Sequence, residues 1–270
     1  MAEPRVIRVV TVSTAALLVL CAAGPAAAQE SWTEVARPYV YQRGGEGNAS
    51  SLTLDYEAGY GSRESRALGQ KGVEQGLRLG AQPFNFLNIE AFGGILLDPE
   101  RGGTTGEAAS LEVTGRVLNQ KSHHVNLDVG VGFMHDYRDA NIPRVRVGLG
   151  GSAGRVDTSI AGLLEIPVGA AARDEVDVML AAGASYRVTD SFRSGLELAA
   201  EDLEGLWDPG EAEGGAKFLF GPTQTLSLPL GMHLKLNTAA VYTYPGNLNT
   251  RISGDTWGFM GRFILGYTYK

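Results

Sequence analysis

Apolar and polar residues alternate along most of the chain from position 51 onward. The last stretch, 257–269, is the clearest case, with large apolar or aromatic residues at Trp257, Phe259, Phe263, Leu265, Tyr267 and Tyr269. A period of two places successive side chains on opposite faces of a β-strand, whereas an amphipathic helix repeats its apolar residues every three or four positions. Twelve segments of the chain show the two-residue period. The pattern therefore predicts an all-β protein.

The connections between these segments alternate between long and short. Long connections are expected at 61–72, 98–107, 135–143, 167–175, 202–213 and 245–255. Short turns, rich in Gly, Pro, Asn, Asp and Ser, are expected at 82–85, 119–122, 151–154, 188–191 and 229–232. An even number of strands of about ten residues, with tight turns at one end and longer loops at the other, is typical of outer-membrane barrels. We therefore predict a transmembrane up-and-down antiparallel β-barrel of about twelve strands over 51–270, with both termini periplasmic.

The first 28 residues have the pattern of a secretory signal peptide. A short basic region is followed by the apolar run VVTVSTAALLVL and by small residues before Gln29. We expect 1–28 to be removed, and 29–50 to form a periplasmic lead-in to the first strand. The single cysteine, Cys21, lies inside the signal peptide, so the mature chain is expected to form no disulfide.

The lead-in carries a local motif. The segment ARPYVYQRGG, residues 36–45, resembles the stretch before the first strand of many uncharacterised Gram-negative outer-membrane barrel proteins. Those proteins share an Arg-Pro-apolar-x-apolar-x-x-Gly sequence there. Such barrels usually end in an aromatic residue that the barrel-assembly machinery reads, and here Tyr269 is penultimate. The resemblance implies an outer-membrane location, with the assembly machinery, outer-membrane lipid and lipopolysaccharide as partners, and it brings no catalytic residues.

A soluble secreted sandwich or lipocalin-like barrel is the main alternative. Its strands would also alternate, but its apolar side chains would point inward around a dry core. The opposite face of these strands carries too many charges and glycines for such a core. No run of consecutive apolar residues approaches the length of about 18 that a membrane-spanning helix needs. The net charge of −7 argues against a nucleic-acid partner.

Strand parity selects the charged residues that should face the barrel interior. The lumen-lining candidates are Asp55, Glu57, Arg78, Glu90, Glu112, Arg116, Asp128, Arg144, Arg146, Asp177, Glu197, Lys217, Lys235 and Arg262. Acids and bases are nearly balanced, which fits two interpretations: ion pairs that fill the interior, or a polar channel lined by both signs. Inward glycines such as Gly76, Gly130 and Gly266 would leave space and favour the channel. Twelve strands would leave at most a narrow passage.

The sequence offers little for catalysis, and we expect no enzyme activity, no cofactor and no dedicated metal site. His135 is predicted to face lipid, but Ser110, the serine at its height, should face the lumen. His123, His124 and His233 are expected at short turns. The segment 201–213 has six acids and no base. The predicted function is therefore a narrow passive channel for small polar solutes. The alternative is a non-conducting structural or adhesive barrel whose outer loops bind partners or divalent cations.

Overall fold

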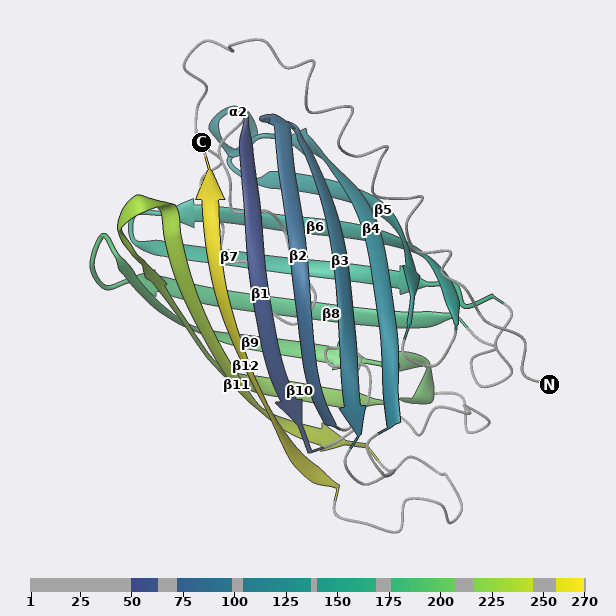
Figure 1. Cartoon of the computed structure of the whole chain (residues 1–270). Helices are drawn as coiled ribbons and strands as arrows, with labels where there is room; N and C mark the ends of the chain where they lie inside the picture. The colour runs from purple at the N-terminus through teal and green to yellow at the C-terminus, as the bar shows by residue number, and fades with distance from the viewer. Residues whose placement is uncertain are drawn as a thin grey trace, which may run out of the picture.

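The computed structural model describes residues 50–62, 72–98, 104–136, 140–168, 176–206, 216–244 and 256–269. Over these ranges the chain forms twelve strands in one closed antiparallel barrel. Each strand pairs with its neighbours in sequence, and the first strand pairs with the last, as Figure 1 shows for β1 in purple and β12 in yellow. The predicted fold is confirmed. The expected signal peptide and nearly all of the lead-in lie outside the described residues.

The strands run between short turns at one end of the barrel and longer connections at the other. They are β1 (Ser51–Gly61), β2 (Gly72–Phe84), β3 (Leu87–Asp98), β4 (Thr104–Leu118), β5 (Asn126–His135), β6 (Asn141–Ala153), β7 (Val156–Glu165), β8 (Asp177–Arg187), β9 (Phe192–Glu201), β10 (Lys217–Ser227), β11 (Met232–Thr243) and β12 (Trp257–Tyr269). Among the residues that the structure describes, three connections contain a short helical turn: α2 (Gln120–His123), η2 (Leu203–Leu206) and η3 (Pro229–Gly231). In the described part of the chain, no helix is long and apolar enough to cross a membrane.

One pair of connections departs from the expected lengths. The connection expected over 135–143 spans only 136–140, because β5 extends to His135 and β6 begins at Asn141. The turn expected over 119–122 spans 119–125, because the short helix α2 lies between the end of β4 and the start of β5. Asn119 caps this helix by accepting a hydrogen bond from the Lys121 amide at 2.9 Å. Such a cap satisfies an amide that the first turn of a helix leaves open. The difference between long and short connections therefore disappears at β5.

The strand β12 closes the barrel against β1. Their register runs from Leu52 opposite Tyr269 to Gly61 opposite Met260, so the pairing covers nearly the whole of β1. Thr53 and Thr268, opposite one another on the inward face, bring their hydroxyl oxygens to 3.2 Å. Closure removes the two open edges whose unpaired backbone groups would otherwise face the membrane.

The outward face of the barrel is apolar and carries aromatic residues at both ends. At the long-loop end, Trp257 contacts Tyr242 at a ring-centroid distance of 4.9 Å. At the short-turn end, Phe84 stacks on Phe86 at 5.4 Å, and Tyr269 ends β12. Aliphatic residues such as Leu198 lie between the two ends and are exposed. Aromatic girdles around an apolar band are the pattern of a barrel seated in a lipid bilayer.

Candidate functional site

The charged residues selected by strand parity all lie at inward positions of the barrel. Ten of them are buried, and these are Asp55, Glu57, Arg78, Glu90, Glu112, Arg146, Asp177, Glu197, Lys217 and Arg262. The other four, which are Arg116, Asp128, Arg144 and Lys235, are half-buried. The contacts of these residues determine whether they form one site or several.

Arg78 on β2 lies between two carboxylates. Its Nε donates to Glu57 on β1 at 2.7 Å, and its Nη1 donates to Glu90 on β3. The register explains this contact, because Asp55 and Phe92 stand directly opposite Arg78, so Glu57 and Glu90 are its diagonal neighbours on the same face. The guanidinium also lies over the Phe92 ring, 4.9 Å from its centroid.

Arg262 on β12 extends this group across the closing seam of the barrel. Its guanidinium lies 3.5 Å from Glu74 on β2 and 3.8 Å from Glu57 on β1. Arg262 is 3% exposed and Glu57 is 2% exposed, so these charges are packed against other side chains instead of standing in open solvent. The first and last strands are therefore joined by ion pairs as well as by backbone hydrogen bonds.

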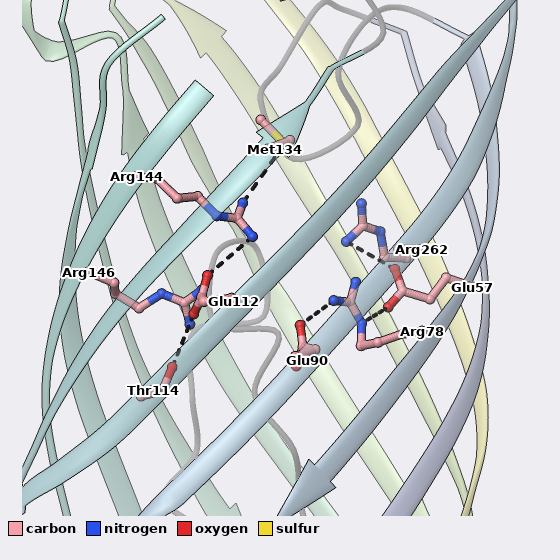
Figure 2. A network of polar contacts seen from close by, with 9 residues as sticks. All are labelled: Glu57, Arg78, Glu90, Glu112, Thr114, Met134, Arg144, Arg146 and Arg262. Carbon is pink, nitrogen blue, oxygen red and sulfur yellow. Dashed lines mark hydrogen bonds and ion pairs between the residues drawn. The ribbon is translucent and has the colours of Figure 1, made fainter. Parts of the chain in front are cut away.

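A second group surrounds Glu112 on β4. Arg146 on β6 donates to its carboxylate at 2.6 Å, and Arg144 lies 3.2 Å from it. The Thr114 hydroxyl adds a hydrogen bond at 3.2 Å, while Nη1 of Arg144 also lies 3.8 Å from the sulfur of Met134. Figure 2 shows both groups side by side inside the barrel, with Glu90 of the first group on the side that faces Glu112. Together with Glu74 they comprise four arginines and four glutamates, which we call the charged wall: Glu57, Glu74, Glu90, Glu112, Arg78, Arg144, Arg146 and Arg262.

Further ion pairs lie outside the charged wall. Arg116 donates to Asp128 at 2.8 Å and Arg193 donates to Asp157 at 2.5 Å. On β9, Glu197 accepts a hydrogen bond from the Asn237 amide at 3.0 Å. The interior charges are therefore mostly matched with a nearby group of opposite sign or a polar donor, as buried charges require.

His233 lies on a strand and not in a short turn, contrary to the expectation from the sequence. It is the second residue of β11, it is buried, and its Nε2 lies 3.0 Å from Oδ1 of Asp55 on β1. A side chain at Gly266 on the intervening β12 would collide with both groups, so this glycine lets His233 and Asp55 meet across the strand.

At the inward glycines Gly76, Gly130 and Gly132, close neighbours already lie where a side chain would stand. At Gly76 a Cβ would collide with the Phe92 ring, and at Gly130 it would press on the Thr114 hydroxyl. At Gly132 it would meet Arg144. The expectation that these glycines widen the lumen is therefore wrong for these positions, because neighbouring side chains occupy the space that the missing Cβ leaves.

A group of inward apolar residues was missed by reasoning from the sequence, which considered only the charges and glycines of the inward face. Strands β7–β12 bury one contiguous cluster, which we call the apolar wall: Leu163, Met179, Ala181, Ala199, Leu219, Ala239, Val241, Met260 and Ile264. Most of these residues lie toward the long-loop end of their strands. The available signal was loss of alternation, since 178–182 and 263–265 are apolar at every position.

The long-loop end above the apolar wall is acidic. Asp177 begins β8, Asp202 follows β9 and Glu204 lies in η2, and all three are buried. Lys217 at the start of β10 donates to Asp202 at 2.5 Å. The pKa of Glu204 is raised to about 7: burial is the main cause and the charges of Asp177 and Asp202 add to it, while the hydrogen bond from the Val178 amide opposes the shift. Residues 207–213, the rest of the acidic segment 201–213, lie outside the described residues.

The residues considered for catalysis do not form a nucleophile–base pair. Ser110 on β4 stands opposite Met134 on the inward face, whereas His135 is paired with Ala109 in the next position. The His135 Nδ1 instead lies 3.3 Å from the Asn141 side-chain oxygen.

Comparison with known proteins identifies the class of fold. No family model and no curated protein matches this chain. Among solved structures, an outer-membrane channel from Pseudomonas putida F1 is similar with a TM-score of 0.57 and 11% identity, covering 85% of this chain and 98% of that one. The KdgM porin, solved in complex with disordered oligogalacturonate, has a TM-score of 0.54 and 8% identity, covering 81% and 98%. The NanC porin also has a TM-score of 0.54, with 10% identity, covering 79% and 98%. The chain thus has the fold of bacterial outer-membrane β-barrels.

Proposed function

We propose that this protein resides in the outer membrane of a Gram-negative bacterium and forms a narrow passive channel for small polar solutes. The observation that carries the proposal is the charged wall, which lines one side of a closed barrel with four arginines and four glutamates. A protein whose interior served only as a core would bury apolar groups at lower cost in desolvation. The porins and the channel with the same fold support the same function.

The composition of the charged wall also suggests the type of solute. Because its positive and negative charges balance, it offers hydrogen-bond donors and acceptors without a strong net field. Neutral or zwitterionic polar solutes should therefore pass best, and ion selectivity should be weak. Twelve strands lie between the eight that side chains just fill and the sixteen or more of wide porins, and the low exposure of Arg262 also supports a narrow passage.

The decisive experiment is electrical recording from the refolded protein in planar bilayers. We expect small, steady conductance steps in potassium chloride. Folding and insertion are checked independently by the difference in gel migration between unheated and boiled samples. A liposome-swelling assay with sugars of increasing size then measures the width of the passage, and we expect a low size limit.

A second candidate is a non-conducting barrel that serves membrane structure or binds partners through its outer loops. The burial of the charged wall favours it, because Glu57, Arg78 and Arg262 are all at most 5% exposed. Electrical silence and absence of swelling, from protein that is folded and inserted, would decide for this candidate and against the channel.

The proposed orientation places both termini and the short turns in the periplasm, with the long connections outside. The expected partners are outer-membrane lipid, lipopolysaccharide and the barrel-assembly machinery. A cysteine at exposed Leu206 should react with an impermeant maleimide on intact cells, and a cysteine at exposed Ser122 should react only after lysis. The opposite labelling would invert the topology while leaving the channel proposal open to the recording.

A further inference from the structure

The outward face of β10 and β11 is polar halfway along the two strands. Leu226 of β10 and Leu234 of β11 stand opposite one another on the short-turn side, and Phe220 lies on the long-loop side. Between these apolar residues the outward face carries Gln224 and Thr238, both exposed. Thr238 is the seventh of the twelve residues of β11, so it lies near the middle of its strand. Polar groups at this height meet lipid tails, which offer them no hydrogen bond.

Pro222 interrupts the pairing of β10 with β11 at the same place. The paired residues of β10 stop at Phe220 and resume at Thr223, in an unchanged register that puts Pro222 opposite Thr238. Proline has no N–H, so the Thr238 carbonyl loses the donor that another residue at 222 would supply. A Cβ at Gly221 would collide with that carbonyl oxygen, so the two strands approach closely there. The polar outward residues therefore lie where the ladder of backbone hydrogen bonds is incomplete.

The side chains around this break are small. On β12, Gly261 stands opposite Thr238, and a Cβ added to Gly261 would have no neighbour nearer than 4.0 Å. Pro222, Thr238 and Gly261 thus form a row of small residues across three strands. Small residues at a contact inside a membrane let two backbones approach closely, and polar side chains beside them form hydrogen bonds across the contact.

We propose that Pro222, Gln224, Thr238 and Gly261, which we call the β10–β11 patch, form the contact surface between two copies of this barrel in the membrane. The Gln224 amide and the Thr238 hydroxyl both donate and accept hydrogen bonds, so the patch is complementary to itself. Two copies inserted in the same direction carry these groups at the same depth. A two-fold axis along the membrane normal then brings each Gln224 to the patch of the other copy.

A second copy fits the β10–β11 patch better than the other possible occupants. A lipid tail has neither donor nor acceptor, and a different membrane protein would need matching polar groups at the same depth. The patch lies on the outside of the barrel, whereas the charged wall lies on the inside. Association would therefore give a dimer in which each barrel keeps its own interior, whether or not that interior conducts.

Sedimentation equilibrium of the refolded protein, in an uncharged detergent of matched density and under reducing conditions, tests the proposal. We expect an equilibrium between monomer and dimer. Gln224→Leu and Thr238→Val should each weaken the dimer by about tenfold or more, because two-fold symmetry makes every hydrogen bond at the contact occur twice. Energy transfer between donor-labelled and acceptor-labelled barrels in lipid vesicles repeats the measurement in a bilayer, and it should fall in the same two variants.

Gln75→Leu is the matched control. Gln75 is another exposed outward glutamine, but its strand β2 is paired without interruption at this position, with Ala58 of β1 and Ile95 of β3. This variant should dimerise as the native chain does. Gln224→Leu places an apolar side chain against lipid, so it should fold at least as well as the native chain, which the gel migration of unheated samples checks.

Three results would overturn the contact surface. The first is a native chain that is monomeric in both the detergent and the vesicles. The second is a dimer of Gln224→Leu and of Thr238→Val that is as tight as the native dimer. The third is a loss of association in Gln75→Leu as large as in Gln224→Leu, because the effect would then come from the outward face in general.

Discussion

Strands β1–β6, joined by Arg262 of β12, carry the charged wall on their inward face, whereas strands β7–β12 bury the apolar wall on theirs, beside separate pairs such as Arg193 with Asp157. Both sets of strands have the same outward face of apolar residues, so lipid contact does not explain the difference. The charged wall gains specificity from directional contacts, and the apolar wall gains stability from close packing. The comparison shows that one barrel can have a polar side and a core-like side within a single ring of strands.

The largest effect is expected from breaking the charged wall at its centre. Arg78→Met leaves the carboxylates of Glu57 and Glu90 without the arginine between them. Removing one partner of a buried ion pair costs about 3–5 kcal/mol, and we expect a loss of that size in the free energy of unfolding measured by urea in lipid vesicles.

The control for Arg78→Met replaces the carboxylates as well. The triple variant Arg78→Met, Glu57→Gln and Glu90→Gln should recover much of the lost stability, because it no longer buries unmatched charge. If Arg78→Met were as stable as the native chain, the charged wall would be solvated and not packed.

Truncating a side chain of the apolar wall should destabilise the barrel by leaving a cavity. Leu219 is 1% exposed within this cluster, so Leu219→Ala should cost about 2–5 kcal/mol in the same unfolding assay. Leu180→Ala, on the outward face of β8, is the matched control, and its cost should be smaller because lipid tails fill the vacated space. Equal costs at the two positions would show that the interior of β7–β12 is not close-packed.

A smaller effect is expected from one hydrogen bond in the charged wall. Thr114→Val keeps the shape of the side chain and removes the donor to Glu112. A hydrogen bond to a charged group contributes about 1.5–3 kcal/mol, and we expect a loss within that range or just below it, since two arginines still hold Glu112. Loss of all folded protein would assign Thr114 a role in packing instead.

The smallest effect concerns ion selectivity and applies if the barrel conducts. Glu112→Gln leaves Arg144 and Arg146 uncompensated and should shift the reversal potential in a salt gradient toward anions. The double variant Arg144→Gln and Arg146→Gln leaves Glu112 alone and should shift it toward cations. Both shifts should shrink as the Debye length falls from about 8 Å at physiological salt to about 3 Å at 1 M. Shifts of the same sign in both variants would exclude the charged wall from the conduction path.

Strand order, the number of strands and the face on which each charge lies could be predicted from the sequence, because a two-residue period leaves little freedom. The contacts of those charges could not. Parity places Arg78 on the inward face, but only the register decides that Glu57 and Glu90 are its diagonal neighbours. The position of Arg262 beside Glu74 depends on closure between strands that are far apart in the chain.

The apolar wall was hidden for a different reason. In 178–182 the residues of both strand faces are apolar, so the alternation that identifies a lipid-facing strand disappears there. Which of these residues point inward can be deduced only from the alternation of the flanking residues. Only part of the acidic group formed by Asp177, Asp202 and Glu204 could be predicted from the sequence. The run of acidic residues that begins at Glu201 contains Asp202 and Glu204, but Asp177 belongs to the preceding strand, β8. Its convergence with Asp202 and Glu204 follows from the path of the backbone between β9 and η2, where Asp202 adopts a positive φ of 50°.

The position of Arg262 has a consequence for how the chain matures. The carboxylates of Glu57 and Glu74 belong to the first two strands and are made early, whereas their shared arginine arrives with the last strand. The pairing of β12 with β1 therefore closes the sheet and brings Arg262 to both carboxylates in the same step, so that charge pairing at the seam is coupled to closure of the barrel.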